Sequence, residues 1–272
     1  MALPPQRQSH IVKQRTGPDD PILHETLQEA LAQVSAQDVI AIADELSARH
    51  ERIFLNLKVD SASLKSSFAD VASAVTHTRA NAKVLTNYFA HGDFNFFDDL
   101  LNGADPTLVR VARFVHKLDA LDTRLAVELA SGLLYNISPK DNWLWTRWLW
   151  DPTTGTGILP LLAGSTHNLL ADNIADGYAR VGMVTAMSMK FAEGTGLWTD
   201  ELIANEKRAQ FANSAFLACA YNVYLYGTTS WRLSREFNNL LPSLPNMARK
   251  LLGLKKKNEE NKPTFEDGAL AP

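Results

Sequence analysis

The sequence contains very little cysteine, no long apolar run and no excess of charge of one sign. Its single cysteine, Cys219, excludes an intramolecular disulfide and a cysteine-rich zinc site. No stretch approaches the roughly 18 uninterrupted apolar residues of a membrane-spanning helix, and the N-terminal residues lack the apolar centre of a secretory signal. Lysine and arginine number 27 against 30 acidic residues, a net charge of −3, so the chain cannot attract nucleic acid through its overall field. We expect a soluble, cytoplasmic protein without a membrane span.

Motifs of common catalytic and metal sites are also missing. The seven histidines show no paired metal spacing, and Gly-x-Ser-x-Gly does not occur. Glu-x-x-His, which a di-iron helical bundle needs twice, is absent as well. The glycine-containing run at 154–157 lacks the lysine of a phosphate-binding Walker loop. We therefore expect no cofactor and no enzymatic activity.

Helical periodicity dominates what is present. Of the 272 residues, 46% are hydrophobic and 21% charged, which is ordinary for a folded chain that needs no disulfide or metal to hold it. Apolar residues recur at spacings of three and four from Leu23 onward, as they do along one face of a helix. The pattern predicts an all-α protein of roughly ten helices, globular or bilobed, including helices over 64–92, 94–101, 106–135, 160–190 and 199–226.

Proline, glycine and charge patterns divide the chain into three parts. We expect a flexible N-terminal arm, a helical body and a polar C-terminal tail at 1–21, 22–253 and 254–272. The loop at 151–160 leaves two arrangements of the body open, one globule or two lobes at 22–150 and 160–253.

A basic stripe on the predicted 106–135 helix is the most informative pattern. On a helical wheel four cations lie within about 60° of one another, beside the apolar face: Arg110, Arg113, Lys117 and Arg124. Such a row suits a phosphate backbone, because each neutralised phosphate releases counterions. Two further pairs extend the candidate nucleic-acid-binding set: Arg79 with Lys83, and Arg232 with Arg235 beside Trp231. The alternative interpretation is a solvated helix face that Glu128 partly neutralises.

A tryptophan-rich segment follows Ser138–Pro139, with indoles at 143, 145, 148 and 150. If the segment is helical, several of these rings share a face with neighbouring leucines. A buried core or a subunit interface is the favoured interpretation, with each indole N–H bonded to a carbonyl. A ligand site is the alternative.

One pair of carboxylates has a spacing that suits metal binding. Asp172 and Asp176 lie one helical turn apart, where they could hold Mg²⁺ together with a diphosphate. Helical isoprenoid synthases use such motifs in pairs from facing helices, and this chain offers only one. A position in the first turn of a helix is the simpler interpretation.

Together these features predict a self-assembling structural protein that coats or packages single-stranded nucleic acid. The chain would form homo-oligomers through its terminal arms and contact phosphates through the basic stripe. This plan is similar to that of helical viral nucleocapsid and flexuous coat proteins, although no motif identifies such a family. The alternative is a soluble α-helical enzyme or lipophilic-ligand-binding protein, whose pocket the tryptophan segment, Asp172 and Asp176 would line. A protein–protein adaptor is a third candidate.

Overall fold

The chain is mostly helical in the part that the structure describes. The computed structural model describes residue 31 and residues 34–57, 61–76, 78–90, 94–163, 167–230 and 243–254. Within these ranges it contains 11 helices and no strand, which confirms the predicted all-α class. The helices are α2 (Ala36–Leu57), α3 (Ser61–Val75), α4 (Arg79–Phe89), α5 (Asn95–Asn102), α6 (Thr107–Lys117), α7 (Thr123–Ile137), α8 (Leu159–Ala163), α9 (Ile174–Glu193), α10 (Asp200–Ala204), α11 (Glu206–Ser230) and α13 (Leu244–Leu251).

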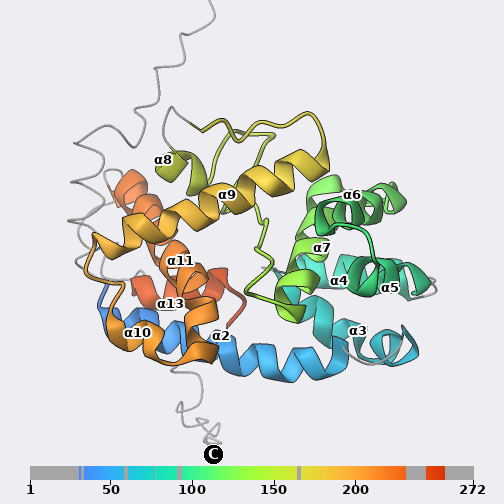
Figure 1. Cartoon of the computed structure of the whole chain (residues 1–272), viewed down its shortest axis with the longest axis horizontal. Coiled ribbons are helices and arrows are strands. Elements are labelled where there is room, and N and C mark those ends of the chain that lie inside the picture. Colours follow the sequence, from blue (N-terminus) through green and yellow to red (C-terminus); the bar gives the residue numbers. More distant parts are fainter. Residues whose placement is uncertain are drawn as a thin grey trace, which may run out of the picture.

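The helices surround a shared apolar interior. Figure 1 shows α2 and α9 along opposite edges of the molecule, with α3 to α6 at one end and α10, α11 and α13 at the other. One buried cluster extends from Val39 on α2 to Ala248 on α13. Helix α11 packs on α2, and α9 packs on α6, so helices from both sides of the loop at 151–160 share one core.

The predicted domain boundaries lie partly beyond these helices. The arm at 1–21 and the tail from residue 255 onward are outside the described residues, and the division into lobes stays a prediction. None of the described helices has both the length and the apolarity to cross a membrane.

Helix α7 is buried on all sides over most of its length. Every residue from Leu125 to Asn136 is buried, most of them apolar, and the buried run also includes the polar residues Glu128, Ser131 and Asn136. Gly132 lets α3 approach closely, because a Cβ at this position would lie 2.8 Å from the Cβ of Val75. The helix begins where the Asp122 carboxylate accepts hydrogen bonds from the backbone N–H groups of Arg124 and Leu125.

The continuous helix predicted over 106–135 is wrong, because α6 and α7 are separate. Helix α6 ends at Lys117, and a turn follows in which the Leu121 N–H donates to the Leu118 carbonyl at 2.9 Å. The N-cap at Asp122 then starts a new helix. Arg124 therefore does not share a helix with Arg110, and the wheel that grouped the four cations does not describe the structure.

Other predicted boundaries move for similar reasons. The helix predicted over 64–92 divides at Thr78, whose hydroxyl caps α4 by accepting from the Asn81 N–H at 3.1 Å. The helix predicted over 199–226 divides at Asn205 into α10 and α11. Helix α9 begins at Ile174, much later than the predicted 160. The tryptophan segment contains no helix.

Candidate functional site

The tryptophan segment follows an irregular path that its own indoles hold in place. The backbone N–H of Trp145 donates to the Ser131 hydroxyl on α7 at 3.0 Å. Trp145 Nε1 donates to the Trp150 carbonyl at 3.1 Å. Trp143 Nε1 donates to the Tyr178 carbonyl on α9 at 2.7 Å, and the two rings stack with centroids 4.7 Å apart. The prediction that these indoles are packed and bonded to carbonyls is confirmed for Trp143 and Trp145.

Two glycines on α9 let this helix approach the indoles. A Cβ at Gly177 would lie 2.5 Å from Cη2 of Trp145, and a Cβ at Gly182 would lie 2.1 Å from Cε2 of Trp143. Either contact is far shorter than van der Waals distance. Both positions therefore require glycine if the rings keep their places.

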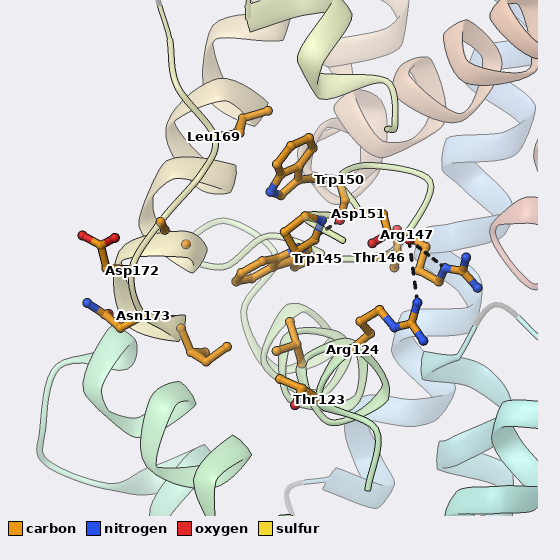
Figure 2. Close-up of a pocket in the computed structure, with 15 residues that line it drawn as sticks. Thr123, Arg124, Trp145, Thr146, Arg147, Trp150, Asp151, Leu169, Asp172 and Asn173 are labelled. Carbon is orange, nitrogen blue, oxygen red and sulfur yellow. Dashed lines mark hydrogen bonds and ion pairs between the residues drawn. The ribbon is translucent and has the colours of Figure 1, made fainter. Parts of the chain in front are cut away.

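A cavity of about 290 Å³ opens beside Trp145 and Trp150. Its walls come from three stretches that are distant in sequence, at 123–127, 145–152 and 169–177. These are the first turns of α7, the tryptophan segment with the start of its following loop, and the segment leading into α9. Figure 2 shows Arg124, Arg147 and Asp151 on one side of the cavity, with Asp172 and Asn173 opposite.

Two buried polar atoms among the lining residues have no hydrogen-bond partner in the described part of the chain. They are Trp150 Nε1 and Thr146 Oγ1. Both residues are only 5% exposed. Figure 2 shows the Trp150 nitrogen on the side of its ring that faces the segment leading into α9. A buried indole N–H usually finds an acceptor, so this donor is an exception that calls for an explanation.

The charged side of the cavity is centred on Asp151, whose side chain is 2% exposed. Its Oδ2 accepts from Arg147 Nε at 3.2 Å and lies 4.0 Å from Arg124 Nη1, and its Oδ1 accepts from the Thr153 N–H at 3.0 Å. Burial alone would raise the pKa of Asp151, but these hydrogen bonds and the two guanidinium charges outweigh it and hold the pKa below its usual value. Asp151 is therefore an ionised carboxylate whose charge is balanced by the guanidinium groups of Arg147 and Arg124.

The glycine-containing run beyond Asp151 forms a tight turn. The Asp151 N–H donates to the Thr156 carbonyl at 2.8 Å, which closes the only isolated bridge among the described residues. Gly155 and Gly157 have φ of 63° and 134°, and a Cβ at Gly157 would lie 2.3 Å from the Leu149 carbonyl oxygen. These glycines are explained by the backbone.

The predicted phosphate-binding cations on α6 are mostly engaged within the protein. Arg113 Nη1 contacts Asp99 Oδ1 at 2.7 Å, and its Nη2 pairs with Asp105. Arg110 donates to the Leu100 carbonyl and, at 3.0 Å, to the hydroxyl of Thr107. These two guanidinium groups hold α6 against α5 and the loop that joins them.

The rest of the predicted set is dispersed. Lys117 and Lys83 are exposed on different helices. Arg124 pairs with Asp122, Nε to Oδ1 at 3.0 Å and Nη2 to Oδ2 at 2.9 Å, and it also lines the cavity. The Arg79 side chain, Arg232 and Arg235 lie outside the described residues.

Two further residues that the sequence analysis named are buried. Glu128, which the alternative interpretation placed on a solvated face, is 2% exposed and accepts from Asn81 Nδ2 at 3.4 Å. The single cysteine, Cys219, is also buried, and burial raises the pKa of this thiol to about 12.

The Asp172/Asp176 pair is arranged around the start of α9. Asp176 Oδ2 accepts from Arg180 Nε at 2.9 Å, and the Asn173 side chain between the two carboxylates caps the helix through the Asp176 N–H at 3.0 Å. Among the described residues no group of three histidine, cysteine or acidic side chains could hold a metal ion. Only Asp172 of the pair lines the cavity.

A second hollow lies between α2 and α11, beside His50 and Phe211. Its rim carries an exposed ion pair in which Lys207 Nζ lies 2.6 Å from Glu51 Oε1. The His50 ring contacts the Phe211 ring at a centroid distance of 5.3 Å, and burial lowers the pKa of this imidazole. The rings of His50, Phe54 and Phe211 line this hollow, whose volume is about 340 Å³, and all of its lining residues lie on these two helices.

Comparison of the chain with known protein families, with curated proteins and with solved structures finds no match. The site therefore rests on its own geometry. The sequence predicted the tryptophan segment, Asp172 and Asp176 as lining residues of its alternative pocket, and of the two carboxylates only Asp172 lines the cavity. It missed Val127, Ile174 and Gly177, which carry no recognisable motif and line the cavity only because the chain folds back.

Proposed function

We propose that this chain binds a small, largely apolar molecule in the cavity beside Trp145 and Trp150. The observation that carries the proposal is the buried Trp150 Nε1–H, a donor without a partner among the described residues, on an indole that lines the cavity. An unmatched buried donor costs free energy, which a bound acceptor would recover.

The size and lining of the cavity support this function. Its volume of about 290 Å³ is at the lower end of the roughly 300–1,000 Å³ of small-molecule sites. Indole rings, Val127, Leu169 and Ile174 provide apolar walls with a few polar groups, the usual composition of such sites. The described lining residues include no histidine, cysteine or lysine, and of their two carboxylates Asp151 is held by two arginines and Asp172 is exposed. The arrangement therefore favours binding over general acid–base catalysis.

The packaging of nucleic acid, which the sequence favoured, stays a prediction with less support. Arg113 and Arg124 each pair with aspartates, so a phosphate would have to displace a carboxylate from both. The four cations also do not form a single row, because Arg110, Arg113 and Lys117 lie on α6 and Arg124 lies on α7. The ligand-binding alternative has a formed cavity in its favour.

A cavity-filling substitution tests the proposal. Ile174, half-buried at the first position of α9, lines the cavity, so Ile174→Trp should fill it. We expect equilibrium dialysis to show saturable binding of 2-acetylnaphthalene, one molecule per chain, to the natural protein. The same ligand at about tenfold above its Kd should raise the Tm by roughly 2–6 °C. The Ile174→Trp variant should show neither effect.

Ile203→Trp is the matched control. Ile203 is 43% exposed on α10, outside the cavity, so the same substitution should leave binding unchanged there. Absence of saturable binding to the natural protein, or equal binding to both variants, would contradict the proposed function.

A further inference from the structure

The polar groups in the interior of the cavity fall into two sets with different roles, while Thr123, Asp172 and Asn173 line it as exposed residues. The charged set on one side is internally balanced. Arg147 and Arg124 both face the buried Asp151, and Arg124 also forms two hydrogen bonds with Asp122. Two guanidinium groups thus face two carboxylates, which leaves no net charge on this side for a ligand to neutralise.

The second set is neutral and unmatched. Trp150 Nε1 can only donate, and the Thr146 hydroxyl can donate or accept. Both atoms are buried and without a partner among the described residues. In Trp145, by contrast, the backbone N–H already donates to the Ser131 hydroxyl and the indole Nε1–H to the Trp150 carbonyl. The hydrogen-bonding groups left without a partner are therefore one donor, the Trp150 Nε1–H, and one hydroxyl, of Thr146, that can either donate or accept.

This division discriminates between classes of ligand. The guanidinium groups of Arg124 and Arg147 already face Asp122 and Asp151. A carboxylate buried beside Trp150 would therefore lose its hydration and meet only neutral donors unless it displaced one of these aspartates, an exchange that is strongly unfavourable. A buried ammonium group would need a free carboxylate in the interior, where Asp151 is held by two arginines. Asp172, the other carboxylate that lines the cavity, is exposed. A neutral oxygen loses much less hydration and matches the indole N–H.

We propose that the ligand is an uncharged, ring-sized apolar molecule with one hydrogen-bond acceptor, such as a ketone, ester or ether oxygen, which receives the Trp150 Nε1–H. This inference rests on the proposed function and specifies the class of molecule. The ring lies against the apolar walls beside Trp145, and the acceptor points at Trp150.

Three probes of nearly the same shape test the ligand class by equilibrium dialysis. They are 2-acetylnaphthalene, which carries a ketone, 2-isopropenylnaphthalene, which replaces the oxygen by a CH₂ group, and 2-naphthoate, which carries a negative charge. On the natural protein the ketone should bind about five- to tenfold more tightly than the hydrocarbon, the ratio expected of one hydrogen bond to a buried donor. The naphthoate should bind more weakly than the ketone.

Trp150→Phe removes the donor and keeps an aromatic ring. In this variant the ketone should lose its advantage and bind no more tightly than the hydrocarbon, because its oxygen would be buried without a donor. The hydrocarbon should keep its affinity within about threefold. Trp198→Phe is the matched control, because Trp198 lies outside the cavity, and it should retain the preference for the ketone. The comparison of probes on the natural protein needs no variant, so it decides the question even if Trp150→Phe fails to fold.

The outcomes separate the two proposals. If no probe binds saturably, both the proposed function and the ligand class fail. If the ketone and the hydrocarbon bind equally to the natural protein, a cavity exists but the donor has no role, for instance because water satisfies it, and the inference is overturned. Tighter binding of the naphthoate, or an equal loss of ketone and hydrocarbon affinity in Trp150→Phe, would overturn it as well.

Discussion

At the scale of single residues, the cavity depends on how firmly the indole rings beside α9 are held. Trp143 is fixed by its hydrogen bond to the Tyr178 carbonyl and by stacking on the Tyr178 ring. Three of its ring atoms lie within 2.5 Å of where a Gly182 Cβ would be. The ring therefore cannot yield to a larger residue at this position without losing both interactions.

Gly182→Ala should destabilise the protein by about 1–3 kcal/mol, the usual cost of an overpacked core. Urea unfolding of the natural protein and the variant measures the difference. Gly194→Ala is the control, because a Cβ there would lie 3.5 Å from the Phe191 carbonyl, an ordinary contact, in a right-handed conformation. We expect that substitution to change stability by less than about 1 kcal/mol. Equal losses in the two variants would show that the Trp143 contact is not the cause.

Single residues also show what the sequence could predict about the site. The pairing of an indole N–H with a carbonyl is a general rule, and it anticipated Trp143 and Trp145. That the same rule leaves Trp150 unmatched depends on the path of the backbone around it, which no local pattern encodes. The paired state of Arg113 had a visible signal in Asp99 and Asp105, but only the fold shows that they meet.

At the scale of elements, the break between α6 and α7 decides where the cations lie. The apolar period passes through Leu118, Leu121 and Leu125 without interruption, so periodicity alone predicts one helix. Asp122 followed by Thr123 is a capping signal within that run, and the structure uses it to begin α7. Periodicity thus identified the buried faces of both helices but not the boundary between them.

The ion pair of Asp122, the N-cap residue of α7, with Arg124 predicts that the stability of the protein depends on pH. The hydrogen bond and charge of Arg124 lower the pKa of Asp122 in the folded protein. The ion pair therefore contributes stability above the unfolded pKa of about 3.9, and this contribution is lost as the pH falls through the lower, folded pKa. Asp122→Asn keeps a capping oxygen and removes the charge.

Thermal unfolding between pH 7 and pH 3 measures this effect. The natural protein should have a slightly higher Tm than Asp122→Asn at pH 7, since the pair is partly exposed. The difference should shrink toward zero near pH 3. A difference that stays constant over this range would show that the charge of Asp122 does not act through Arg124.

At the scale of the whole molecule, the cavity joins three stretches that are far apart in sequence. Helical periodicity predicted the fold class and most buried faces, because burial imposes that spacing on any amphipathic helix. Periodicity could not predict which helix faces pack against each other, because one apolar surface can pack against many others of similar size and shape. The tryptophan segment and the segment before α9 were both recognised in the sequence, but their meeting at α7 is a property of the assembled fold.

The indole signal of Trp150 gives the most direct test of the central claim. The chain has six tryptophans, so a ¹⁵N–¹H NMR spectrum should show six indole Nε1–H signals, and the one missing in Trp150→Phe identifies Trp150. We expect 2-acetylnaphthalene to move that signal downfield, as formation of a hydrogen bond does, and 2-isopropenylnaphthalene to leave it without a downfield shift. A Trp150 signal that responds to neither probe, or equally to both, would contradict the account.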